Sequence, residues 1–132
     1  MRAPAGDAAR LSEEGPLDLK ALEVIRGLQR EGQPDLLDKV IGLYLRDAPG
    51  LLAAMRDAAL KGDAEALRRA AHSLKSSSAN VGAVRLCDAC KALELAARAG
   101  ELDQVDPQLA VIASDFAQAR IALEALLQPA SV

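Results

Sequence analysis

Residues 63–82 read DAEALRRAAHSLKSSSANVG and have a continuous helical pattern. Its small and apolar residues recur at helical spacing and share one stripe. The members of this apolar stripe are Leu67, Ala70, Ala71, Leu74, Ser78 and Val81. Asp63 is of a type that caps helix N-termini, and Gly82 is of a type that ends helices. The stretch therefore predicts one amphipathic helix with its stripe against a core.

The chain before this stretch has the same helical periodicity. Apolar residues predict a first helix from about Asp18 to Gln29 and a second over 34–47, with Pro34 in its first turn. The sequence Asp47-Ala48-Pro49 predicts a break, because proline inside a helix removes a backbone hydrogen bond. A third helix is expected to follow and to end at Gly62.

After residue 82 two more helices are predicted, one over 83–99 before Gly100 and one from Asp106-Pro107 to Gln128-Pro129. No segment alternates apolar and polar residues as a half-buried strand does. Short connections between long amphipathic helices make neighbouring helices antiparallel. The sequence therefore predicts an all-α fold, an antiparallel up-down four-helix bundle with one or more additional short N-terminal helices.

The ends of the chain do not share this pattern. Residues 1–16 are rich in Ala, Gly, Pro and charge without a sustained apolar period, so we expect a flexible leader or linker there. The bundle is expected to occupy residues 17–128 and to leave a tail over 129–132.

The composition argues against several classes of function. Hydrophobic residues make up 51% of the chain and charged residues 27%, which is typical of a folded domain. A net charge of -3 and only 2% aromatic residues argue against a nucleic-acid binder. No stretch approaches the roughly 20 apolar residues that span a membrane. We expect a soluble cytoplasmic monomer with no nucleic-acid or membrane partner, or the cytoplasmic end of a larger protein.

Cys87 and Cys90 form a C-x-x-C pair inside a helical pattern. A structural metal site needs about four ligands, and the chain offers only these two cysteines and one histidine. A thioredoxin-like redox pair needs a βαβ setting, which the pattern lacks. We therefore expect both cysteines to act as small buried hydrophobic residues, with no metal bound.

His72 is the only histidine of the chain. Each helical residue turns by about 100°, which places His72 opposite the apolar stripe and predicts a ring exposed to solvent. The face around it carries Glu65, Arg68, Arg69, Lys75, Ser76 and Ala79. The small Ser76 and Ala79 leave little steric cover over the ring. The three cations on this face outnumber its single carboxylate.

An exposed histidine among basic residues is most often only part of a solvated surface. The chemistry of the residue also permits a function, because a neutral imidazole is a good nucleophile toward phosphorus near pH 7. Neighbouring cations should favour the neutral ring and should attract a phosphoryl group with about two negative charges. The spacing thus makes His72 a candidate phosphoryl acceptor, beside the simpler interpretation as a surface residue.

Residues 70–83, AAHSLKSSSANVGA, resemble the signature of histidine-containing phosphotransfer (HPt) domains, in which a helical H-x-x-K precedes small residues and a glycine. The matching residues are His72, Leu74, Lys75, Ser77, Ser78, Ala79 and Gly82. The resemblance continues upstream over 36–75 and downstream over 85–102, and in all it covers roughly Leu17 to Leu127. A bare H-x-x-K motif has little specificity, but a match of this length with its elements in this order is specific.

The resemblance implies a four-helix bundle that carries a phosphoryl group and is not an ATP-dependent kinase. Members of the family exchange this group with an aspartate of a response-regulator receiver domain, here expected to be part of a hybrid sensor histidine kinase. The receiver domain supplies Mg²⁺, so the chain is expected to need no cofactor of its own. The sequence agrees, since it contains no G-x-x-x-x-G-K-[ST] nucleotide loop.

Carried over to this sequence, the resemblance makes His72 the phospho-acceptor, through its outer ring nitrogen, and Lys75 the residue that steadies the phosphoryl oxygens. The supporting residues are Ser76, Ser77 and Ala79, which clear space, Gly82, which allows a bend, and the cationic Arg68 and Arg69. One position departs from the family pattern. Ser76 stands where the family most often has glycine, which implies altered tuning and not loss of function.

Two alternatives remain open from the sequence. The first is an HPt-like module that binds a receiver or kinase domain without chemistry, and Ser76 motivates it. The second is a bundle enzyme or cofactor protein that uses His72 as a ligand or general base. In the HPt case, we expect apolar contacts to a receiver from Leu22 or Ile25 of the N-terminal helix, although simple packing explains these residues equally well.

Overall fold

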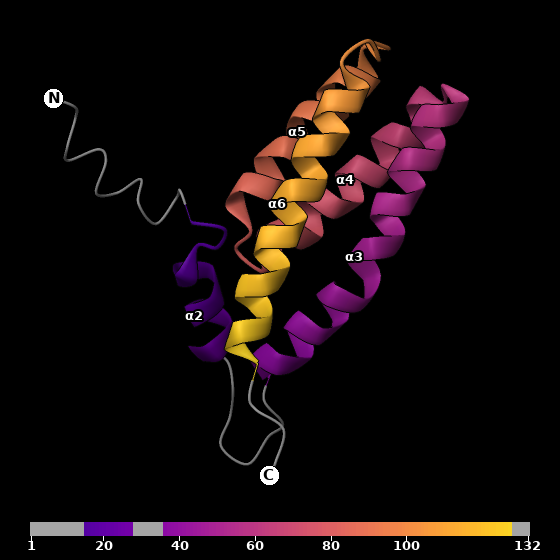
Figure 1. The fold of residues 1–132 in the computed structure, drawn as a ribbon. Coiled ribbons are helices and arrows are strands. Elements are labelled where there is room, and N and C mark those ends of the chain that lie inside the picture. Colours follow the sequence, from indigo (N-terminus) through magenta and orange to yellow (C-terminus); the bar gives the residue numbers. More distant parts are fainter. Residues whose placement is uncertain (1–14, 28–35, 128–132) are drawn as a thin grey trace, which may run out of the picture.

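The computed structural model describes residues 15–27 and 36–127. These residues form α2 (Leu19–Gly27), α3 (Leu36–Lys61), α4 (Ala64–Asn80), α5 (Val84–Arg98) and α6 (Val105–Leu126), and they contain no strand (Figure 1). The prediction of an all-α fold is confirmed. None of these five helices is long and apolar enough to cross a membrane. Residues 1–14 of the leader expected over 1–16, the helix ends expected at Gln29 and Pro34, and the tail lie outside the described residues.

Helices α3 to α6 run alternately up and down, and tight turns connect α3 to α4 and α4 to α5. Each packs on its neighbour in the chain, and α6 closes the bundle against α3. Helix α2 contacts α3 and lies at the end of the bundle where α3 begins and α6 ends (Figure 1). This arrangement confirms the predicted antiparallel bundle with a short additional N-terminal helix.

The break predicted at Asp47-Ala48-Pro49 is wrong, because α3 is continuous and contains Pro49. The proline is exposed, while Ala48 and Leu52 on either side of it are buried at 1% and 7% exposure. The apolar stripe therefore stays in phase through the proline, and its burial outweighs a local cost of about 3 kcal/mol. Figure 1 shows α3 as one bent helix, and proline is a usual cause of such a bend.

The two ends of α4 form as the sequence predicts. At its start, the Asp63 carboxylate accepts a hydrogen bond of 3.0 Å from the Ala66 amide. Just beyond its end, Gly82 has a φ of +73°, and a Cβ there would lie 2.5 Å from the carbonyl oxygen of Asp18. The Gly82 carbonyl also accepts a hydrogen bond from the Asp18 amide. Glycine is therefore required both by the backbone angle and by the approach of the segment that precedes α2.

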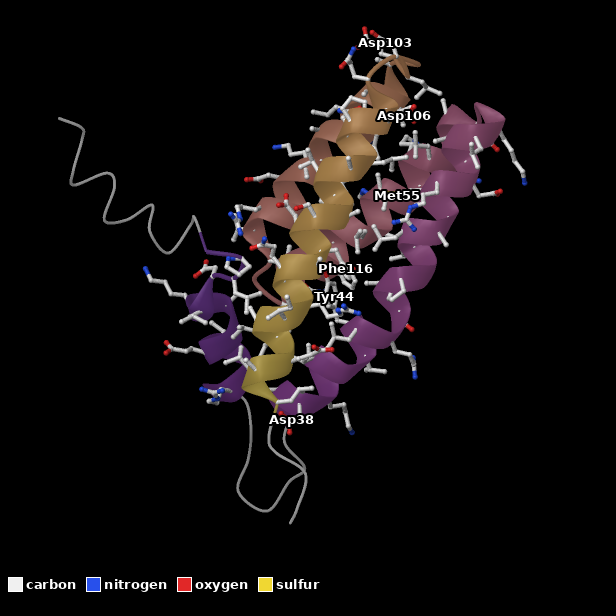
Figure 2. All side chains as sticks on the ribbon, in the orientation of Figure 1. Asp38, Tyr44, Met55, Asp103, Asp106 and Phe116 are labelled. Atoms are coloured by element: carbon white, nitrogen blue, oxygen red, sulfur yellow. The ribbon has the colours of Figure 1, made fainter. Side chains whose placement is uncertain are left out.

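The core consists mostly of aliphatic side chains, and two buried hydroxyl groups within it bond to each other. The hydroxyl groups of Tyr44 and Ser78 are 2.8 Å apart in a buried hydrogen bond between α3 and α4. The ring of Tyr44 also lies 6.1 Å from that of Phe116 on α6, and Figure 2 shows the two side chains between these helices. Burial raises the pKa of Tyr44 to about 12, so its hydroxyl stays protonated.

The two cysteines are free thiols of α5, with Cys87 half-buried and Cys90 buried. Burial raises the pKa of the Cys87 thiol and brings that of Cys90 to about 12. A protonated thiol is a poor nucleophile and a poor metal ligand. Over 15–27 and 36–127, no group of three or more His, Cys, Asp and Glu side chains could hold a metal. Cys90 thus has the buried environment expected of a packing residue, whereas Cys87 is only half-buried.

Candidate functional site

The imidazole of His72 projects from the middle of α4 into solvent. Its side chain is 54% exposed, whereas Leu67 and Leu74 on the other side of the helix are 0% exposed. This contrast confirms the prediction that His72 faces away from the core. The ring is therefore accessible to another molecule from outside the bundle.

A buried carboxylate of the neighbouring helix holds the inner nitrogen of this ring. Glu94 lies on α5, its side chain is only 4% exposed, and its Oε2 is 2.9 Å from Nδ1 of His72. An ionised carboxylate only accepts hydrogen bonds, so Nδ1 carries a proton and its N–H donates the hydrogen bond to Glu94. No described residue forms a hydrogen bond with Nε2, which is left with a free lone pair when the ring is neutral.

Two cations also bind the Glu94 carboxylate. Lys75 Nζ lies 2.7 Å from Oε1, and a guanidinium nitrogen of Arg98 lies 3.1 Å from Oε2. The pKa of Glu94 is lowered, mainly by the hydrogen bond from Lys75. Burial alone would raise this pKa, but the bonds from Lys75 and His72 together outweigh that effect. Glu94 is thus ionised at neutral pH, as the proton on Nδ1 requires.

Glu94 and Arg98 were not among the residues predicted from the sequence, although the pattern of α5 contains a signal for Glu94. Cys90, Leu93 and Ala97 form the buried stripe of this helix, and Glu94 falls on the same side. A carboxylate at a core-facing position is expensive to bury unless cations pair with it. This position of Glu94 therefore predicts a cationic partner, although it does not say which one.

The other two cations predicted near His72 are largely engaged elsewhere. Arg68 donates two hydrogen bonds to Glu65, of 2.9 and 2.6 Å, and Arg69 donates one of 3.3 Å. These bonds lower the pKa of Glu65 to about 2 and raise that of Arg68. Glu94 adds a second carboxylate to the surroundings of His72 and Arg98 adds a fourth cation, so the expected excess of positive charge is unchanged, but each cation is paired with a carboxylate.

The small residues beyond His72 leave the approach to the ring open. Ser76 and Ala79 are exposed on the same side of α4. The hydroxyl of Ser77 donates to the backbone carbonyls of Ser73 and Leu74, at 3.1 and 3.3 Å. Ser77 therefore satisfies its hydroxyl within its own helix, while Ser76 presents its hydroxyl to solvent.

Two predicted contributions lie away from the ring. Gly82 follows the end of α4, ten residues after His72, and its role there is to end the helix and to admit the Asp18 backbone. Leu22 of α2 is 3% exposed within the core, and Ile25 packs against it. Packing is thus the interpretation that the structure supports for Leu22. The exposed apolar residues of α2 are Leu19 and Val24.

Comparisons with known proteins agree with this geometry. The family model described as Hpt domain matches residues 39–128. The crystal structure of histidine-containing phosphotransfer protein B (HptB) from Pseudomonas aeruginosa PAO1 is similar at 32% identity and a TM-score of 0.79, over 85% of this chain and 94% of that one. The comparison with curated proteins finds no match for this sequence.

Two plant structures are similar at lower identity. Histidine-containing phosphotransfer protein MtHPt2 from Medicago truncatula has 25% identity and a TM-score of 0.76, over 91% of this chain and 82% of that one. A putative histidine-containing phosphotransfer protein from rice has 22% identity and a TM-score of 0.75, over 92% and 86%, and supports the fold alone. The family match and the bacterial structure show that this chain belongs to the Hpt domain family, the phosphotransfer proteins of two-component signalling.

Proposed function

We propose that this chain is a phosphorelay intermediate that accepts a phosphoryl group on Nε2 of His72 from a receiver-domain aspartate and passes it to another receiver. The observation that carries the proposal is the exposed ring whose Nδ1 is bound by the buried Glu94. This bond orients the imidazole and fixes its proton on the inner nitrogen, as the orienting carboxylate of a catalytic triad does. The outer nitrogen is then the nucleophile.

The transfer step needs no proton movement. The lone pair of Nε2 attacks phosphorus, the N–P bond forms, and the P–O bond breaks with its electrons leaving on the receiver's aspartate. The ring keeps its Nδ1 proton and becomes positively charged, opposite the Glu94 carboxylate at 2.9 Å. In the reverse direction an incoming aspartate attacks phosphorus, and the N–P electrons return to Nε2.

Lys75 is the residue best placed to attract the phosphoryl oxygens. Its ammonium group lies on the carboxylate that also binds the ring, and its side chain is 27% exposed. Arg68 and Arg69 add longer-range attraction only, because Glu65 engages both. The small side chains of Ser76 and Ala79 allow the receiver to approach closely.

The partner supplies the rest of the chemistry. We propose that the receiver domain brings Mg²⁺ and that this chain contributes no cofactor and no ATP-dependent kinase activity. A receiver of a hybrid sensor histidine kinase is the proposed donor, and a cytoplasmic monomer is the proposed form of the carrier. Size-exclusion chromatography with light scattering tests the monomer, and incubation with labelled ATP alone tests the absence of kinase activity.

The direct test is transfer from a purified receiver phosphorylated with ³²P. We expect label on the wild-type chain that is labile in acid and stable in base, as phosphohistidine is, and no label on His72→Gln. The variant should keep its stability within about 0.5 kcal/mol, because the replaced side chain is exposed.

The outcomes separate the proposal from its alternatives. Binding of the receiver without label on His72 would favour the module that docks without chemistry. Label that persists in His72→Gln would show that the acceptor is another residue. A large loss of stability in that variant would contradict the exposed placement of the ring.

A further inference from the structure

The network around Glu94 contains one cation more than the proposed transfer step uses. His72 is the nucleophile and Lys75 steadies the phosphoryl group, but Arg98 has no role in that scheme. Arg98 is the last residue of α5 and reaches back one turn to Glu94. The following inference rests on the proposed function, since it concerns the phosphorylated form of His72.

Arg98 lies close to the ring because both bind the same atom. Its guanidinium nitrogen and Nδ1 of His72 are each within 3.1 Å of Oε2 of Glu94, so the two nitrogens are at most about 6 Å apart. The Arg98 side chain is also 59% exposed, so it can turn toward solvent without disturbing the core. A phosphoryl group on Nε2 lies across the imidazole ring from Nδ1, on the solvent side.

Phosphorylation of the ring changes the balance of charge around the Glu94 carboxylate. In the free protein the Glu94 carboxylate accepts hydrogen bonds from two cations, Lys75 and Arg98, and from the neutral His72 ring. A phosphoryl group adds about two negative charges and three strong acceptor oxygens next to them. A guanidinium binds such oxygens through two parallel hydrogen bonds, which its single bond to Glu94 does not provide.

We propose that Arg98 is a second phosphoryl-binding residue. Glu94 holds the Arg98 guanidinium near the ring in the free protein, and the guanidinium moves to the phosphoryl oxygens when His72 is phosphorylated. Arg68 and Arg69 are less suited to this role, because Glu65 binds them through three hydrogen bonds on the surface of α4. Glu94 keeps its hydrogen bond with Nδ1, so its negative charge still balances the positive charge of the phosphorylated ring.

A purely structural role for Arg98 makes a different prediction. An arginine at a helix C-terminus, paired with a glutamate four residues earlier, stabilises the helix through its dipole and the ion pair. In that case its removal would change stability slightly and would leave the phosphorylated state unaffected. Phosphorylation itself must therefore be the readout.

The first experiment phosphorylates His72 with phosphoramidate, a small donor that needs no receiver, and follows the arginine side-chain Nε–H signals by NMR. We expect the Arg98 signal to shift on phosphorylation. The signal of Arg120, an exposed arginine of α6, should not move. If the protein is phosphorylated at His72 and the Arg98 signal stays in place, the inference is wrong.

The second experiment measures the ratio of phosphorylated carrier to phosphorylated receiver at equilibrium. Arg98→Ala should lower this ratio about fivefold, the scale of one partly exposed charge pair. Arg98→Lys keeps the charge but not the two parallel hydrogen bonds, so it should restore only part of the ratio. Arg120→Ala is the control and should have no effect. Arg98→Gln gives a second neutral variant if Arg98→Ala does not fold.

The two proposals fail in distinguishable ways. An unlabelled wild-type chain would refute the carrier function and the role of Arg98 with it. A labelled wild-type chain whose equilibrium ratio is the same in Arg98→Ala, within twofold, would refute the role of Arg98 alone.

Discussion

Replacing Glu94 by glutamine tests the reasoning about the acceptor nitrogen most directly. The variant keeps the size of the side chain but removes its charge, and its amide can donate as well as accept. The carboxylate forces Nδ1 of His72 to be the protonated nitrogen, and an amide in the same place does not. We therefore expect Glu94→Gln to release the ring from a single tautomer.

The size of the effect follows from the hydrogen bond. A bond to a charged group contributes about 1.5–3 kcal/mol and a neutral one about 0.5–1.5 kcal/mol. The His72 ring is 54% exposed, which favours the low end of the difference, about 1 kcal/mol. This corresponds to a change of about fivefold in the ratio of the two tautomers.

The assay is a two-dimensional ¹⁵N NMR experiment on the imidazole, since protonated and unprotonated ring nitrogens have different chemical shifts. His72 is the only histidine, so its signals need no separate assignment. In the wild type, Nδ1 should be the protonated nitrogen of the neutral ring throughout a pH titration, and Glu94→Gln should show a mixture. Glu65→Gln, at the exposed carboxylate on α4, is the matched control and should leave the tautomer unchanged.

The tautomer is the decisive measurement, because Glu94→Gln also frees Lys75 and Arg98 to act on an incoming phosphoryl group. A wild-type ring with its proton on Nε2 would refute the assignment of the nucleophile. An unchanged tautomer in Glu94→Gln would refute the role given to Glu94, even if the rate of transfer falls.

Three further results are expected. Lys75→Ala should slow transfer to His72 about tenfold without unfolding the chain, and unchanged single-turnover kinetics would contradict its role. Gly82→Ala should lower the free energy of unfolding in urea by at least about 2 kcal/mol, because a left-handed φ and the Asp18 carbonyl both oppose a Cβ; a loss below about 0.5 kcal/mol would refute this. The pKa of Glu94 is lowered on folding, so its ionised form stabilises the fold above the ordinary value of 4.5, and this contribution is lost as the pH falls through the lower folded value. The difference in melting temperature between wild type and Glu94→Gln should therefore shrink on acidification, and a difference independent of pH would contradict the ionised network.

Most of the fold could be predicted because local patterns determine it. The helical spacing of the apolar residues predicted which side of α4 is buried, and Asp63 and Gly82 predicted its ends. The break predicted at Pro49 does not occur, because local propensity alone does not determine whether this helix continues. The cost of proline inside a helix is real, but the buried residues of α3 stay in phase across it and their packing prevails.

Only the part of the candidate site that lies on a single helix, α4, could be predicted from the sequence. His72 and Lys75 lie on the same helix, so their proximity follows from their spacing. Glu94 and Arg98 come from the neighbouring helix, and their placement depends on how α4 and α5 pack, which spacing within a helix does not determine. The same limit applied to charge, since counting cations on α4 left out the buried carboxylate that faces them.

The carboxylate that orients the His72 imidazole thus belongs to a different helix, α5, from the imidazole itself. Any sliding or rotation of α5 against α4 changes the separation of Nδ1 and Oε2, and with it the orientation of the reactive nitrogen. A substitution at the fully buried Leu93, which directly precedes Glu94, can therefore alter phosphoryl transfer without touching the exposed surface. Variation in transfer rates among related bundles is consequently to be sought in interior residues as well as in those that meet the partner.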